Sequence, residues 1–164
     1  HMDDLHRTAT PYEIAAMRVQ LQESLEAGAL GLSTGLAYAS AFNAKTDEVL
    51  QLVEELTAYG AVYTTHLRSE FEPVLEAMDE AFLIGRHARV PVIISHLKCA
   101  GAGNWGRSPQ LLAALEAAAK DHPVGCDCYP YAASSSTLDL KQVTDAFRIT
   151  ITWSTPHPQM GGRD

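Results

Sequence analysis

The sequence predicts an α/β fold of about four parallel βα units, and three observations support that prediction. Short apolar segments rich in β-branched residues alternate with longer segments whose apolar residues recur at helical spacing. The alternation repeats roughly every 30 residues, the usual length of a strand with its crossover helix. Because such a crossover returns the chain to a neighbouring strand in the same direction, the predicted strands are parallel.

Four segments have the length and composition of buried strands. Each is short, mainly apolar and bounded by glycine, proline or a polar loop. Strands that helices cover on both faces have this composition. The four predicted strands are residues 29–36, 61–67, 90–97 and 124–131.

The segments between the strands carry helix start signals. Thr10, Pro11 and Glu13 form a capping box with a proline in the first turn of the helix that they begin. Thr46 is expected to cap a second helix. Two further helices are predicted to begin at Pro73 and Ser108.

The βα pattern ends after Tyr131. The small, hydroxyl-rich residues 132–137 follow, and residues 147–153 then alternate polar and apolar side chains, which predicts a strand of a different kind. Prolines and glycines near residue 164 indicate a loop at the end of the sequence.

Composition excludes some classes of function. The formal net charge is −8 and there is no basic run, so the chain is not expected to bind nucleic acid. A membrane span needs about 18 continuous apolar residues, and the sequence has no such run. Three cysteines, Cys99, Cys126 and Cys128, predict reduced thiols and a cytoplasmic protein. Cys126 and Cys128 are a weak zinc signal, and small buried strand residues are the favoured interpretation.

His66 and His96 are the candidate metal ligands. They are one βα unit apart, near the carboxyl ends of two predicted neighbouring strands, where parallel α/β proteins build their sites. Strand alternation groups His66 with Val62 and Thr64 on one face. A single strand-end histidine is more often structural, but two in register favour a metal site. Catalytic zinc uses three protein ligands and water, so two histidines are an incomplete set.

Lys98 and Tyr129 are candidate substrate-binding residues. Alternation places Val92, Ile94, His96 and Lys98 on one face of the third predicted strand, so Lys98 is expected beside the metal. There it suits an anionic substrate group, and the phenol of Tyr129 suits the same anion. A solvated loop lysine and a packed aromatic ring are the respective alternatives.

Arg68 is a weaker candidate for the same site. It follows His66 by two residues, so it is expected to face either the site or an acidic neighbour.

Three segments contain the candidate site residues: residues 65–68, 95–101 and 127–131. Residues 28–36 precede them, and residues 149–154 and 156–158 follow near the end. These segments resemble the N-acyl-D-amino acid deacylases, the D-aminoacylases of the amidohydrolase superfamily. The likeness covers nearly the whole chain and preserves the spacing among His66, His96, Lys98 and Tyr129.

This resemblance implies a partial TIM-like (β/α) barrel and a domain division. A complete barrel takes about 250 residues, whereas this chain has 164. Residues 3–137 would span about the fourth to seventh barrel strands, and residues 138–164 would begin a small inserted domain.

The resemblance also implies a reaction and its residues. A zinc-dependent enzyme would hydrolyse an N-acyl-D-amino acid, a small molecule, to a D-amino acid and a carboxylate. His66 and His96 match zinc ligands, and Lys98 and Tyr129 match residues that hold the substrate carboxylate. The paired histidines of the first barrel strand, a cysteine ligand and the general acid/base aspartate have no counterpart here. The chain alone is therefore expected to be inactive or nearly so, with no catalytic residue of its own.

Part of a barrel leaves strand edges and apolar interior uncovered, so the chain is expected to associate with itself or to adopt a rearranged fold. The sequence also leaves two other functions open. One is a non-catalytic, self-associating α/β scaffold whose histidines are relics, and the other is a cyclic-amidase type of amidohydrolase.

Overall fold

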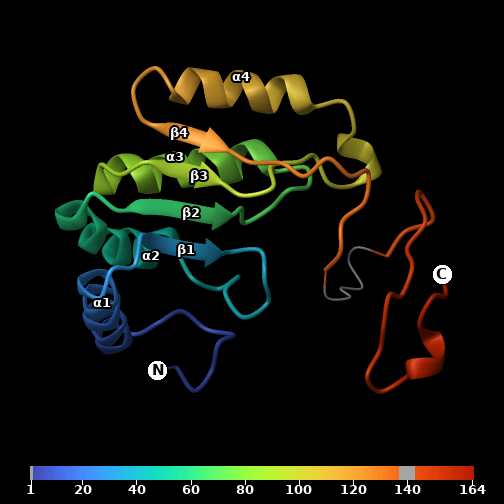
Figure 1. The fold of residues 1–164 in the computed structure, drawn as a ribbon, viewed down its shortest axis with the longest axis horizontal. Helices are drawn as coiled ribbons and strands as arrows, with labels where there is room; N and C mark the ends of the chain where they lie inside the picture. The colour runs from blue at the N-terminus through green and yellow to red at the C-terminus, as the bar shows by residue number, and fades with distance from the viewer. Residues whose placement is uncertain (1, 137–142) are drawn as a thin grey trace.

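The computed structural model describes residues 2–136 and 143–164, and its centre is a four-stranded parallel sheet (Figure 1). The strands are hydrogen-bonded in sequence order, β1-β2-β3-β4, and each is paired in parallel with the next. The predicted parallel α/β architecture is confirmed. The strands are β1 (Gly31–Gly35), β2 (Val62–His66), β3 (Val92–Ile94) and β4 (Val124–Cys126).

Helices connect the strands, as the sequence predicts. Each predicted helix is present, and the second continues into a 3₁₀ helix before Gly60 adopts a left-handed conformation. The α-helices are α1 (Pro11–Glu26), α2 (Thr46–Val53), α3 (Val74–Ala88) and α4 (Ser108–Ala118). The 3₁₀ helices are η1 (Glu54–Tyr59), η2 (Ala102–Asn104) and η4 (Pro158–Met160).

The starts of α1 and α2 differ in their capping. The capping box of α1 is confirmed: Glu13 N–H donates to Thr10 Oγ1 at 3.3 Å, and Thr10 N–H donates to Glu13 Oε2 at 2.8 Å. The prediction for Thr46 is wrong. Lys45 is the N-cap of α2, and the Thr46 hydroxyl donates to Glu80 Oε1 on α3 at 2.7 Å. The Thr46 hydroxyl therefore makes a tertiary contact with α3 instead of capping α2.

The hydrophobic core lies between the sheet and the helices. Tyr63 and Thr65 of β2 and Ile94 of β3 are buried on that side, together with apolar residues of α2 and α3. The other face of the sheet is more open, and Ile93 of β3 is 37% exposed there. Helices therefore cover one face of this sheet, while the residues of the second face form a less buried surface.

Strands β3 and β4 are shorter than predicted, and residues 147–153 do not form a strand. Their segment is closed by two backbone hydrogen bonds, from Ile151 to Arg163 and from Gly162 to Ile151, both 2.7 Å. Only Ile151 of this segment makes these two bonds, and a strand needs such pairing over several consecutive residues. The predicted domain boundary, between residues 137 and 138, lies outside the described residues.

The cysteines contradict one expectation from the sequence. Cys99, Cys126 and Cys128 are free thiols, as predicted, but Cys126 and Cys128 are exposed rather than buried. β4 is the last strand of the described sheet, so its side chains are less covered than those of β2. Among the described residues, no helix combines the length and the apolar character that crossing a membrane requires.

Candidate metal centre

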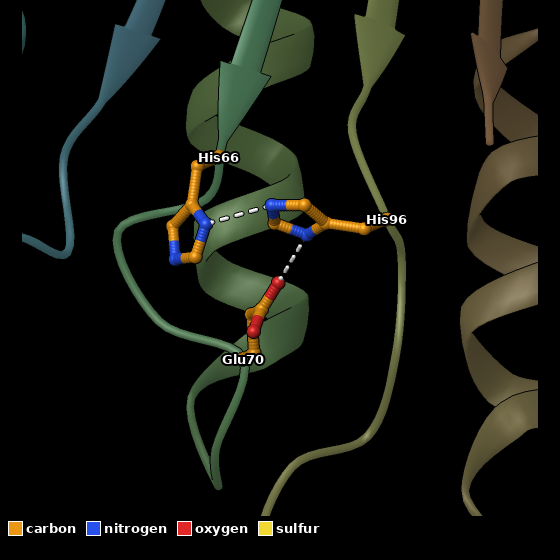
Figure 2. A group of neighbouring side chains, drawn as sticks. All are labelled: His66, Glu70 and His96. Atoms are coloured by element: carbon orange, nitrogen blue, oxygen red, sulfur yellow. Dashed lines mark hydrogen bonds and ion pairs between the residues drawn. The ribbon is translucent and has the colours of Figure 1, made fainter. Parts of the chain in front are cut away.

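His66 and His96 meet at the carboxyl edge of the sheet (Figure 2). His66 is the last residue of β2, and its Nδ1 lies 2.9 Å from His96 Nε2. The two rings are nearly perpendicular, with centroids 4.5 Å apart. The structure therefore brings together the two residues that the sequence singled out.

His66 faces this edge as strand alternation predicts. Val62, Thr64 and His66 are half-buried on the open face of β2, while the residues between them are buried against the helices. Burial is the main cause that lowers the pKa of His66, and its neighbours His96 and Lys98 lower it further while Glu70 opposes them. A lowered pKa keeps the imidazole neutral near pH 7, the form that binds metal.

His96 reaches the same place by a different route, so one expectation from the sequence was wrong. Thr65 pairs with Ile94, and both are buried, so alternation along β3 would turn His96 toward the helices. Instead the strand ends at Ile94, and His96 adopts a left-handed backbone conformation with φ of 42°. The predicted shared face of Val92, Ile94, His96 and Lys98 does not exist because the strand does not extend that far.

Asp127 holds this turn. Its Oδ1 accepts a 2.6 Å hydrogen bond from the backbone N–H of His96. Its own backbone pairs with both sides of the turn, because its N–H donates to the Ile94 carbonyl and its carbonyl accepts from the Leu97 N–H. A left-handed conformation costs a non-glycine residue about 1–2 kcal/mol. The contacts of Asp127 offset that cost and aim the His96 ring at His66.

Glu70 is a site residue that the sequence analysis missed. It lies in the loop after β2, and its Oε1 is 2.9 Å from His96 Nδ1 (Figure 2). One ligand-type atom from each of His66, Glu70 and His96 lies within 4.8 Å of the others. Glu70 lies in a loop, where no hydrophobic periodicity indicates which way a side chain faces. The sequence points to it only through its position four residues after His66.

Lys98 and Tyr129 also lie at this site. Lys98 Nζ is 2.5 Å from Glu70 Oε1 and 2.9 Å from His96 Nδ1. It is also 5.4 Å from the centroid of the Tyr129 ring, a distance typical of a cation–π contact. The predicted neighbourhood of Lys98 and His96 is therefore present, with Glu70 as the counter-charge of the ammonium.

Arg68 faces an acidic neighbour rather than the metal centre. Its guanidinium donates to both carboxylate oxygens of Glu80 at 2.8 Å and to the carbonyls of Phe42 and Ala44 at 3.0 and 2.9 Å. Arg68 therefore ties the loop between β1 and α2 to α3.

An open cleft of about 550 Å³ adjoins the two histidines. Tyr38, from the loop that Arg68 ties down, forms one wall and packs on His66 with ring centroids 4.9 Å apart. Hydroxyl groups of Ser33, Thr34 and Ser95 line the cleft as well. A small polar molecule can therefore approach His66 and His96 from this side.

The facing nitrogens fit a zinc ion. Tetrahedral zinc holds imidazole nitrogens at about 2.1 Å, so two such ligands lie about 3.4 Å apart. The observed separation of 2.9 Å needs only a small outward rotation of the rings. Neutral imidazole is a ligand that suits zinc and other borderline divalent metals.

Comparison with known proteins identifies close relatives of the whole chain, although no family model matches it. It is 45% identical over 163 residues to the D-aminoacylase of Alcaligenes xylosoxydans xylosoxydans. It is 46% identical over 164 residues to the N-acyl-D-aspartate deacylase of the same organism. These alignments cover 99% of this chain but only 34% and 33% of the relatives. The chain thus spans about a third of the length of the curated relatives that it matches.

Solved structures agree with the sequence relatives. A crystal structure of D-aminoacylase, described as defining a subset of amidohydrolases, matches with a TM-score of 0.95, covering 99% of this chain and 34% of that one. The N-acyl-D-glutamate deacylase of Bordetella bronchiseptica, complexed with zinc and a phosphonate inhibitor, matches with a TM-score of 0.92 and 39% identity, covering 98% and 34%. An L-hydantoinase of Arthrobacter aurescens, 19% identical over 75% of this chain and 31% of its own, shares the fold with a TM-score of 0.52.

Asp127 is expected to stabilise the turn at His96. We expect Asp127→Ala to lower the free energy of unfolding by about 1 kcal/mol, because the His96 N–H loses an ionised acceptor near the surface. Urea unfolding measures that change, and the ¹⁵N amide shift of His96 reports the turn itself. Asp127→Asn keeps an acceptor oxygen and should recover most of both effects. Asp121→Ala, an exposed aspartate after α4, is the control. An unchanged His96 shift in Asp127→Ala would show that the turn needs no such support.

Proposed function

We propose that this chain, which matches the N-acyl-D-amino acid deacylases over 99% of its length, supplies part of the active site of a zinc-dependent amidohydrolase. The reaction is hydrolysis of the amide bond of an N-acyl-D-amino acid to a D-amino acid and a carboxylate. The observation that carries the proposal is the 2.9 Å approach of His66 Nδ1 and His96 Nε2 at the carboxyl edge of the sheet.

His66 and His96 would hold the zinc through these facing nitrogens. Zinc at such a site polarises the scissile carbonyl and lowers the pKa of a bound water. The protein's contribution here is orientation: β2 presents His66, and the turn clamped by Asp127 presents His96. The zinc complex of the N-acyl-D-glutamate deacylase supports this assignment of the metal.

Lys98 and Tyr129 would hold the carboxylate of the substrate. Lys98 Nζ lies 2.9 Å from His96 Nδ1 and 5.4 Å from the centroid of the Tyr129 ring, and its ammonium supplies the positive charge. A free carboxylate next to the scissile amide is the group that distinguishes an N-acyl amino acid from a cyclic amide. The lysine therefore favours the deacylase function over the cyclic-amidase alternative, which has the shared fold as its support.

The pair of histidines is an incomplete catalytic zinc site. Such sites use three protein ligands and a water. Within the described residues the metal-type cluster at this edge is His66, Glu70 and His96, but Glu70 contacts His96 Nδ1 rather than the nitrogen that faces His66. Asp127 is already engaged by the His96 backbone. We therefore propose that the chain by itself binds zinc weakly and turns over little substrate. The cytoplasm, where its three free thiols stay reduced, is the proposed location.

Binding of N-acetyl-D-amino acids to the zinc-supplemented chain tests the function. Calorimetric titration should detect a D-enantiomer bound more tightly than its L-enantiomer, because the metal and Lys98 fix two groups around one chiral centre. Lys98→Met should weaken binding at least tenfold through loss of a charge-assisted contact of about 1.5–3 kcal/mol. The exposed Lys120→Met is the matched control.

An uncharged ligand sharpens this test. The corresponding N-acetyl-D-amino acid amide, which has no free carboxylate, should bind poorly to the unaltered chain. Equal binding of the acid and the amide would contradict carboxylate recognition. Rapid zinc-dependent release of D-amino acid by this chain alone would contradict the incomplete site.

We also propose that the chain associates with itself when it is isolated. Its open sheet face exposes Ile93, and Leu30 just before β1 is 85% exposed. Uncovered apolar side chains beside free strand edges favour association. Sedimentation velocity should show a mass that rises with protein concentration. A single monomeric species over the whole concentration range would refute this proposal.

A further inference from the structure

Glu70 occupies a position between two other residues of the metal centre. Its Oε1 lies 2.9 Å from His96 Nδ1 and 2.5 Å from Lys98 Nζ. The Glu70 side chain is 11% exposed, and both of its charged or polar neighbours, His96 and Lys98, are site residues. Figure 2 shows the Glu70 carboxylate at Nδ1 of the His96 ring and His66 at Nε2 of the same ring.

The two nitrogens of His96 therefore have different partners. Nε2 faces His66, and Nδ1 faces Glu70 and Lys98. A neutral imidazole has one protonated nitrogen and one with a free lone pair. If Nε2 is to bind metal, the proton must sit on Nδ1, and it then needs an acceptor.

Glu70 is the acceptor that the site offers. A lysine ammonium has three donors and no acceptor, so Lys98 cannot receive the Nδ1 proton of His96. A carboxylate can accept from the imidazole and from the ammonium at the same time. Lys98 Nζ also lies 2.9 Å from Nδ1, and an ammonium can donate to that nitrogen only when it is unprotonated. The proposed tautomer therefore requires the Lys98 ammonium to donate to Glu70 Oε1 instead.

The same geometry argues against Glu70 as a ligand of a metal that bridges the histidines. His66 Nδ1 and His96 Nε2 would hold such a metal, whereas Glu70 Oε1 contacts the other nitrogen of His96. An outer carboxylate that orients a ligating histidine is a common arrangement around zinc.

We propose that Glu70 is a positioning residue that accepts the Nδ1 proton of His96, directs Nε2 at the metal and anchors Lys98 beside it. The metal part of this inference rests on the proposed function, but the position of the His96 proton does not. Loss of an outer carboxylate of this kind weakens metal binding about 10–100-fold.

Long-range ¹H–¹⁵N NMR of the full chain with ¹⁵N-labelled histidine tests the proton position. The spectrum is recorded at about pH 8, where an unperturbed histidine is neutral. Signals of His96 are assigned by their loss in His96→Gln. We expect the proton on Nδ1 without metal, and zinc at Nε2 once zinc is added. Protonation of Nε2 in the metal-free chain, or zinc at Nδ1, would overturn the proposal.

Substitutions test the role of the carboxylate. Glu70→Ala should remove the preference for Nδ1 and weaken zinc binding at least tenfold, measured by competition with a chromophoric chelator. Glu70→Gln retains a carbonyl acceptor of the same size and should keep the proton on Nδ1 with a smaller loss of affinity. Glu72→Ala removes an exposed carboxylate of the same loop and should change neither the position of the His96 proton nor the zinc affinity. Zinc affinity within about twofold of the unaltered chain in Glu70→Ala would refute the role.

Lys98→Met distinguishes the effect of Glu70 on the His96 proton from the effect of Lys98. If Glu70 sets the tautomer, the proton of His96 stays on Nδ1 in this variant. A shift of the proton would show that Lys98 sets it and would overturn the proposal. If the unaltered chain binds no zinc while its His96 proton follows Glu70 as expected, the metal function fails and the positioning by Glu70 stands.

Discussion

The approach of His66 and His96 depends on the backbone turn that follows β3. The strand pairing alone would send His96 toward the helices, because Thr65 and the paired Ile94 already face that side. The left-handed conformation of His96 reverses this direction, and the carboxylate and backbone of Asp127 hold it. The approach of the two histidines thus depends on contact between the ends of β3 and β4 as well as on β2.

A second set of contacts secures the other side of the site. Arg68 follows β2 and binds Glu80 on α3 together with two carbonyls of the loop after β1. That loop carries Tyr38, which packs on His66 and forms a wall of the cleft. Arg68 and Glu70, which follow His66 closely in the sequence, therefore contact two different parts of the site. Arg68 fixes the cleft wall, and Glu70 contacts the ring of His96 and the ammonium of Lys98.

Much of this arrangement was predictable from sequence periodicity and residue type. The βα alternation predicted the parallel sheet and its helices, and the spacing of the two histidines predicted that they meet at the carboxyl edge of the sheet. The direction of His96 was not predictable, because alternation holds only inside a strand and β3 ends two residues earlier. Glu70 and Asp127 were missed as site residues because contacts between loops decide their roles. The capping role expected of Thr46 was wrong for a similar reason, because its hydroxyl binds Glu80 on another helix.

We propose above that His66 Nδ1 and His96 Nε2 bind one zinc ion. Crystals of the full chain grown with zinc, measured on both sides of the zinc absorption edge, locate that ion directly. We expect an anomalous peak about 2.1 Å from both nitrogens, with Glu70 outside the coordination shell. A peak bound by Glu70 and His96 Nδ1, or no peak beside either histidine, would contradict it.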